Sequence, residues 1–183
     1  MSKSESRTRT GGQLVVDALR AHGVERVFCV PGESYLAVLD ALHDARDTIT
    51  TVACRHEHGA AVMAEAYGKL TGAVGVCLVT RGPGACNASI GVHTAFQDST
   101  PMVLLVGQVP IGHQGREAFQ EVDFTAMFAP LAKRAVQVDR VEGLPAAMAE
   151  DGPALIALRT DPNVITTRAT LAAIRGGAGR RGR

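Results

Sequence analysis

Glu57 is the residue whose type and position best suit proton chemistry. A run rich in β-branched residues, Thr48 to Ala53, leads into Arg55-His56-Glu57-His58, and small residues follow at helical spacing. We therefore expect a strand to deliver Glu57 to the first turn of a helix. The helix N-terminus favours a carboxylate and apolar neighbours favour the neutral acid, so such a glutamate suits proton transfer. A simpler alternative stays open, in which Glu57 only caps its helix.

Two glycine-containing turns also stand between expected strands and helices. Pro31-Gly32-Glu33 follows the apolar run Val27 to Val30, and Gly82-Pro83-Gly84 follows Val74 to Val79. Glycines at such turns let a ligand approach the backbone closely. In a parallel sheet these turns and Glu57 would share the carboxyl edge, where ligands bind. Three marked turns on one edge indicate a site more strongly than any one alone.

The elements that must position these residues alternate between strand and helix. This order predicts an α/β fold, a single three-layer domain whose mostly parallel sheet of about six strands is covered by helices on both faces. The segment from Gln108 to Val122 is long for a connection and is a candidate functional loop. We expect helices at 11–22, 35–44 and 85–96 and from Glu57, and strands at 27–30, 49–53, 74–79, 101–106, 135–138 and 155–158.

The composition narrows the class of protein. A chain of 183 residues suits one domain, and a net charge of +1 gives no reason to expect a nucleic-acid partner. No apolar run approaches the length of a membrane span, so we expect no membrane and a cytoplasmic location. The four cysteines form no C-x-x-C pair, which favours buried free thiols in a reducing compartment.

Several common motifs fail on inspection. Gly82-Pro83-Gly84 lacks the third glycine of a dinucleotide fingerprint, and Gly68-Lys69 is followed by leucine and is no P-loop. His56-Glu57-His58 lacks the histidine spacing of a zinc protease, so no metal site is expected. No serine stands in a G-x-S-x-G elbow, which weakens a hydrolase interpretation.

Six motifs nevertheless stand in an order that resembles a known family. Together they resemble the N-terminal pyrimidine-binding domain of thiamine-diphosphate enzymes, nearest to acetolactate synthase large subunits, over about Thr10 to Val141. The motifs are Phe28-Cys29-Val30-Pro31-Gly32-Glu33, Arg55-His56-Glu57-His58-Gly59-Ala60, Ala66-Tyr67-Gly68, Thr80-Arg81-Gly82-Pro83-Gly84-Ala85-Cys86-Asn87, Asp98-Ser99-Thr100-Pro101 and Ala118-Phe119-Gln120-Glu121.

The resemblance implies a role for each matching residue. Glu57 would be catalytic, because the family glutamate hydrogen-bonds the aminopyrimidine ring of the cofactor and promotes its imino form. The implied reaction decarboxylates a 2-keto acid and passes the carbon unit to an acceptor carbonyl. The implied cofactor-binding residues are Pro31, Gly32, Glu33, Glu57, Thr80, Gly82, Pro83, Gly84 and Asn87, and the substrate-side residues are Phe119, Gln120 and Lys133.

The chain departs from the family pattern in two ways. Arg81, Cys86 and His58 replace the usual serine, threonine and glutamine, which puts the reaction in doubt more than the cofactor. Whole members are about three times longer, hold the diphosphate and Mg²⁺ in a further domain, and in the synthases bind FAD in a middle domain. This chain therefore resembles half of a thiamine diphosphate site, which predicts a truncated protein that is inactive alone.

The expected organisation has an unusual C-terminal part. The last ~30 residues resemble the extreme C-terminus of the same family, which suggests an internal deletion near 141–150. Both ends of the chain are expected to be disordered, the C-terminal one because it is a glycine/arginine tail. The expected segments are an N-terminus at 1–9, the pyrimidine-binding domain at 10–162, an extension at 163–175 and the tail at 176–183.

A non-catalytic role is the alternative function. In this interpretation the chain is a binding or assembly module that pairs with a full-length relative through the helix containing Ala60, Ala61, Ala64 and Gly68. Small residues permit close helix approach, although core packing explains them as well. The same helix predicts a homodimer or pairing with a diphosphate-binding domain, and the small-molecule partner would be a 2-keto acid.

Overall fold

The computed structural model describes residues 9–138 and the strands at 154–158, 164–166 and 169–170. Residues 1–8 of the expected N-terminal segment, the expected junction at 141–150 and the expected tail at 176–183 lie outside the described residues. The helices are α1 (Gly11–Ala21), α2 (Leu36–Asp44), α3 (Glu57–Thr71), α4 (Arg81–Asp98) and α5 (Phe124–Phe128), with 3₁₀ turns η1 (Glu33–Tyr35) and η2 (Ile111–His113). The strands are β1 (Arg26–Cys29), β2 (Thr50–Ala53), β3 (Gly75–Thr80), β4 (Met102–Gly107), β5 (Arg134–Val138), β6 (Ala154–Leu158), β7 (Val164–Thr166) and β8 (Ala169–Thr170).

The main sheet is parallel throughout. Its strands follow the order β2-β1-β3-β4-β6-β5, and every neighbouring pair is parallel, while β7 and β8 form a separate antiparallel pair. The predicted class, an α/β domain with a parallel sheet between helices, is confirmed.

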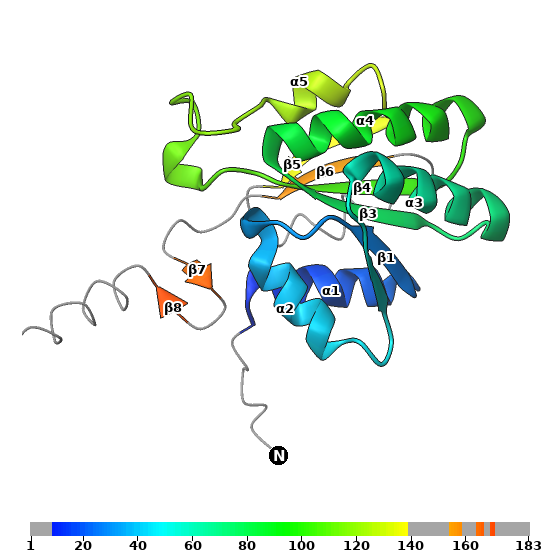
Figure 1. Ribbon diagram of the computed structural model, residues 1–183, viewed down its shortest axis with the longest axis horizontal. Coiled ribbons are helices and arrows are strands. Elements are labelled where there is room, and N and C mark those ends of the chain that lie inside the picture. The colour runs from blue at the N-terminus through cyan, green and yellow to red at the C-terminus, as the bar shows by residue number, and fades with distance from the viewer. Residues whose placement is uncertain (1–8, 139–153, 159–163, 167–168, 171–183) are drawn as a thin grey trace, which may run out of the picture.

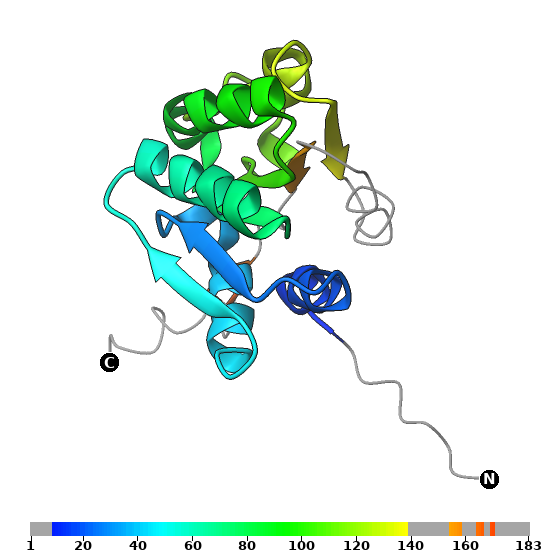
Figure 2. The same cartoon turned by 90° about the vertical axis from the view of Figure 1, so that its right-hand side faces the viewer.

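Helices cover both faces of this sheet. Figures 1 and 2 show α1 and α2 on one face and α3, α4 and α5 on the other. Each face has its own apolar core, as expected where parallel strands are buried on both sides. The first core includes Leu19, Val27, Leu42, Ile49 and Leu78, and the second includes Ala61, Ala64, Val79, Leu104 and Phe128. In the part of the chain that the structure describes, no helix is long and apolar enough to span a bilayer.

Local sequence signals set both ends of α1. The Thr10 side chain accepts a hydrogen bond from the Gln13 backbone N–H, and the Gln13 side chain accepts one from the Thr10 backbone N–H. This capping box satisfies two donors that have no acceptor within the helix. Gly23, at φ +70°, follows the C-cap in the left-handed conformation that glycine adopts readily. The predicted start of this helix is confirmed, and its end lies one residue earlier than predicted.

Thr10→Ala is expected to lower the free energy of unfolding by about 1 kcal/mol, because a helix donor loses its acceptor. Chemical denaturation of the chain measures the change. Thr94→Ala is the matched control, since the Thr94 hydroxyl bonds the Ile90 carbonyl within α4 and caps nothing. A loss of stability in the control as large as that in Thr10→Ala would remove the capping explanation.

The start of α4 differs from the prediction. Gly82-Pro83-Gly84 was expected to be a turn before a helix at 85–96, but α4 begins at Arg81 and these residues form its first turn. Pro83 is tolerated there because its missing N–H would have no acceptor within the helix. Arg81, the first residue of α4, has a φ of +46°, which is unusual for a residue with a side chain.

The small residues of α3 face inward. Ala60, Ala61 and Ala64 are fully buried, and Gly68 lies against the Pro101 carbonyl of its own chain. These small residues therefore pack inside the domain, and pairing with a relative through this helix stays a prediction. Close packing of α3 on α4 and the sheet is what these residues provide.

Candidate functional site

Glu57 is the first residue of α3, as predicted. Strand β2 ends at Ala53, and His56 then caps the helix through its Nδ1, which accepts from the His58 N–H at 3.2 Å. This bond makes Nδ1 an acceptor and leaves the proton of a neutral imidazole on Nε2. The half-buried Glu57 side chain therefore stands at a helix N-terminus, where the helix dipole stabilises its negative charge.

A side chain from α4 contacts this carboxylate. Asn87 Nδ2 donates a hydrogen bond to Glu57 Oε2 at 2.9 Å. Gly84 lies beside them, and a Cβ on it would stand 3.7 Å from Glu57 Oε1. The first turn of α3 thus meets the first two turns of α4 at the carboxyl edge, and the donor from Asn87 orients the carboxylate.

The segment after β1 contacts the segment after β3. A Cβ on Gly32 would lie 2.4 Å from the Thr80 Cβ, so only glycine fits at this crossing. The hydroxyls of Ser34 and Thr80 share a hydrogen bond of 2.6 Å. The structure therefore brings together the predicted residues of the three marked segments.

Arg81 adds an ion pair between the same two segments. Its Nη1 lies 2.9 Å from Glu33 Oε1, and its side chain is only 16% exposed. Among the described residues no hydrogen-bond partner is found for its buried Nε. The positive φ of Arg81 costs free energy, and the contacts of its side chain must offset that cost. Residues held in such conformations cluster at functional sites.

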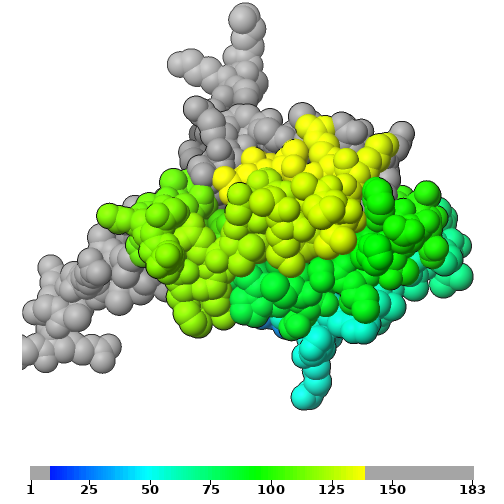
Figure 3. Space-filling view, turned by 90° about the horizontal axis from the view of Figure 1, so that it is seen from above, coloured from blue at the N-terminus to red at the C-terminus, as the bar shows by residue number. Residues whose placement is uncertain are grey.

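Phe119 and Gln120 reach this edge on the loop between β4 and α5. The Gln120 carbonyl accepts a 2.9 Å hydrogen bond from the Gly82 N–H of α4, while the Phe119 side chain is 77% exposed. Figure 3 shows the loop projecting at one end of the face that α4 covers. Gln120 therefore lies against the first turn of α4, and Phe119 extends into solvent.

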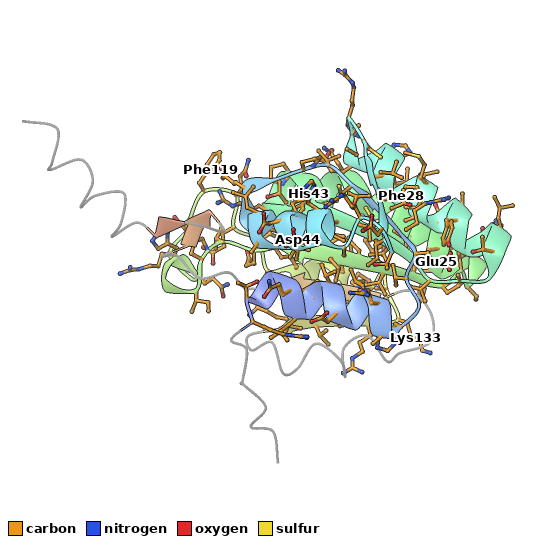
Figure 4. The ribbon with its side chains drawn as sticks, turned by 90° about the horizontal axis from the view of Figure 1, so that it is seen from below. Glu25, Phe28, His43, Asp44, Phe119 and Lys133 are labelled. Carbon is orange, nitrogen blue, oxygen red and sulfur yellow. The ribbon has the colours of Figure 1, made fainter. Side chains whose placement is uncertain are left out.

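Lys133 lies elsewhere. It precedes β5, and because β5 is parallel to the other strands, this places it at the amino edge of the sheet. Figure 4 shows Phe119 and Lys133 at opposite ends of the molecule, with Glu25 on the side of Lys133. The structure does not bring Lys133 to the site.

Burial keeps the neighbouring thiols and phenol neutral. Desolvation raises the pKa of Cys29 to about 11, with a smaller contribution from Cys54. Desolvation also raises the pKa values of Tyr35 and Cys77, and the negative charge of Glu57 adds to both. All four cysteines are free, with Cys29 and Cys77 buried and Cys86 exposed. The buried thiols are therefore structural, since a reactive thiol needs a lowered pKa.

In the described ranges, no group of three or more histidine, cysteine or acidic residues is arranged to hold a metal ion.

The sequence prediction missed Ser34 and the ion-pairing role of Arg81. Ser34 carries no motif signal, whereas Arg81 was visible as a departure from the family pattern. What the edge offers chemically is one oriented carboxylate beside the backbone of Gly84.

Comparison with known proteins gives the family. Residues 9–127 match the model described as "Thiamine pyrophosphate enzyme, N-terminal TPP binding domain". Over 140 residues the chain is 45% identical to the acetolactate synthase isozyme 2 large subunit of Escherichia coli, covering 76% of this chain and 25% of that protein. It is 39% identical over 163 residues to an acetolactate synthase of Arthrospira platensis, covering 83% and 28%.

A third relative, an acetolactate synthase of Bacillus subtilis, is 44% identical over 138 residues, covering 75% of this chain and 24% of that protein. The chain thus spans about a quarter of the length of the curated relatives it matches. The order of motifs, the parallel sheet and the match over 9–127 agree, and the chain belongs to the thiamine pyrophosphate enzymes through their N-terminal domain.

Proposed function

We propose that this chain supplies the aminopyrimidine half of a thiamine diphosphate site in an enzyme of the acetolactate synthase type. The observation that carries the proposal is Glu57, which stands at the N-terminus of α3, receives a hydrogen bond from Asn87 at 2.9 Å and borders Gly84. The similarity to acetolactate synthases supports the reaction class, which is decarboxylation of a 2-keto acid and transfer of the carbon unit.

The residues present fit the pyrimidine end of the cofactor. A Cβ on Gly84 would come within 3.7 Å of Glu57 Oε1, so the bare backbone of Gly84 lies beside the carboxylate. Glu57 would hold a ring nitrogen, and the backbones of Gly32, Gly82 and Gly84 would border the ring. The cofactor, when bound, supplies the carbanion chemistry, and the protein supplies position and electrostatics.

Glu57 would move a proton at its Oε1 or Oε2. Glu57 stands at the N-terminus of α3 and its Oε2 accepts the hydrogen bond from Asn87, so Oε1 would be left to exchange a proton with a ring nitrogen. The ion pair of Arg81 with Glu33 and the Ser34–Thr80 hydrogen bond keep the bordering segments in place.

This half-site needs a partner. The diphosphate end and its Mg²⁺ would be held by a diphosphate-binding domain, and an FAD, if used, would bind in a separate middle domain. The half-site would therefore be completed in a homo-oligomer or beside a diphosphate-binding domain.

Titration calorimetry with thiamine diphosphate and Mg²⁺ tests the proposal. The chain alone is expected to bind weakly, and co-expression with the diphosphate-binding domain of a relative is expected to tighten binding at least tenfold, because the second domain adds the charged contacts. Thiamine without the diphosphate is the control ligand, since it should gain little from the added domain. If the complex forms and binds no more tightly than the chain alone, the half-site assignment is wrong.

A non-catalytic assembly role is the second candidate. It is favoured by the outer surfaces of α3 and α4, where Val62, Met63, Ile90 and Phe96 are each 38–49% exposed. Light scattering at working concentration should then give a dimer, and Met63→Lys should give a monomer. A monomeric wild-type chain would count against this role.

A further inference from the structure

Residues 114–121 form a closed loop around one carboxylate. Glu121 Oε1 accepts a hydrogen bond from the Gly115 N–H at 2.6 Å, and Glu121 Oε2 accepts one from the Ala118 N–H at 3.0 Å. The backbone N–H of Glu121 also donates to the Ala118 carbonyl at 2.9 Å. Both oxygens of one side chain thus satisfy backbone donors at two points of the same loop.

The Glu121 contacts enclose two residues whose backbone conformation is unfavourable. Glu117 has a φ of +54° and Gln120 a φ of +66°, and neither is glycine. Each residue with a side chain in this region costs about 1 kcal/mol or more and persists only where surrounding contacts over-determine it. Here the determining contacts are those of Glu121, which span both residues.

The loop is also docked on the site. The Gly82 N–H donates to the Gln120 carbonyl, and a Cβ on Gly82 would lie 3.0 Å from that oxygen and 2.9 Å from Val122 Cγ2. Gln108 Nε2 donates to the Val122 carbonyl at 2.8 Å. The C-terminal end of the loop is therefore fixed between β4 and the first turn of α4. Without Glu121, the segment from Gly115 to Phe119 would be free to open.

We propose that Glu121 is a positioning residue that closes the 114–121 loop and thereby fixes Phe119 and Gln120 at the carboxyl edge. The part of this proposal that gives Phe119 and Gln120 a substrate-side place rests on the proposed function. The closure itself stands on the contacts of the chain alone. Because Phe119 is exposed at the tip, burial of the aromatic ring does not order the loop, and the side-chain contacts that close it are those of Glu121.

The closure predicts a dependence on pH. Hydrogen bonds from the backbone N–H groups of Gly115, then Ala118, with a smaller one from Arg116, lower the pKa of Glu121 below its ordinary value of 4.5. A carboxyl whose pKa is lowered by folding stabilises the closed loop above its ordinary pKa and loses that effect as the pH falls through the lowered value. The other charged groups on this loop and the segments packed against it are Arg81, His113, Arg116, Glu117 and Asp123, and none of these side chains causes the lowered pKa.

Amide hydrogen exchange of the intact chain tests the proposal. In Glu121→Gln the charge is lost and one acceptor becomes a donor, so protection of the Gly115 and Ala118 amides should fall about tenfold. Glu117→Gln is the matched control, because it makes the same change in the same loop at a side chain outside the closure. Limited chymotrypsin cleavage after Phe119 should accelerate in Glu121→Gln and stay unchanged in Glu117→Gln.

The wild-type chain provides an independent measurement. Protection of the same two amides, relative to their intrinsic exchange rates, should fall as the pH drops below 4.5, while amides in β3 and β4 stay protected. Unchanged protection and cleavage in Glu121→Gln, or equal changes in both variants, would overturn the proposal. Failure of the cofactor-binding test with the exchange result intact would remove the proposed function and leave the closure established.

Discussion

Glu57→Gln is expected to lower the turnover of the complex between this chain and a diphosphate-binding domain by about 10²–10⁴-fold, the range that a positioned acid–base group contributes. Most of the cofactor affinity should remain. Glutamine has the shape of glutamate and its amide oxygen can still accept the hydrogen bond from Asn87, so the first turns of α3 and α4 should stay in place. What the amide cannot do is exchange a proton with the cofactor ring.

Turnover with pyruvate as the 2-keto acid and calorimetry of cofactor binding measure the two effects separately. Glu25→Gln is the matched control, because Glu25 is exposed and lies before β1 at the opposite edge of the sheet (Figure 4). Equal turnover of Glu57→Gln and wild type would remove Glu57 from its role. A parallel loss of turnover and affinity would instead make it a binding residue only.

The sequence predicted the fold through patterns that are local. Apolar runs such as Val74 to Val79 mark strands buried on both faces, and the observed β3 covers most of this run. The cap at Thr10 and the placement of Glu57 at the start of α3 were also predictable, because both follow from residues adjacent in the chain. Alternation of strand and helix then determines which ends of the strands share an edge.

What the sequence could not give depends on contacts between distant segments. The start of α4 at Arg81 requires the pair with Glu33 and the bond from the Gly82 N–H to Gln120, neither of which has a periodic signal. Lys133 was placed on the substrate side by resemblance, but the direction of β5 puts it at the other edge. Asn87 was expected to contact the cofactor. Its hydrogen bond to Glu57 depends on the packing of α4 against α3, which no local sequence pattern predicts.

Gly91→Ala is expected to lower the free energy of unfolding, because Gly91 lies where α4 packs on α3. A Cβ at position 91 would lie 2.6 Å from the Ala61 Cβ and 2.8 Å from the Ala61 carbonyl carbon. Real Cβ atoms do not approach backbone this closely, so the two helices would have to separate. Overpacking of this kind costs about 1–3 kcal/mol, which exceeds the gain of about 1 kcal/mol that alanine brings to a helix interior.

Gly59→Ala is the matched control, and its expected effect has the opposite sign. Gly59 lies in α3, and an added Cβ there would meet nothing within 4 Å. Only the helix propensity changes, so the variant should be more stable than wild type by up to about 1 kcal/mol. Urea denaturation of both variants should therefore place the wild type between them. A Gly91→Ala chain as stable as Gly59→Ala would mean that α3 and α4 are not in contact at Ala61, and the alignment of Asn87 with Glu57, which depends on that contact, would lose its support.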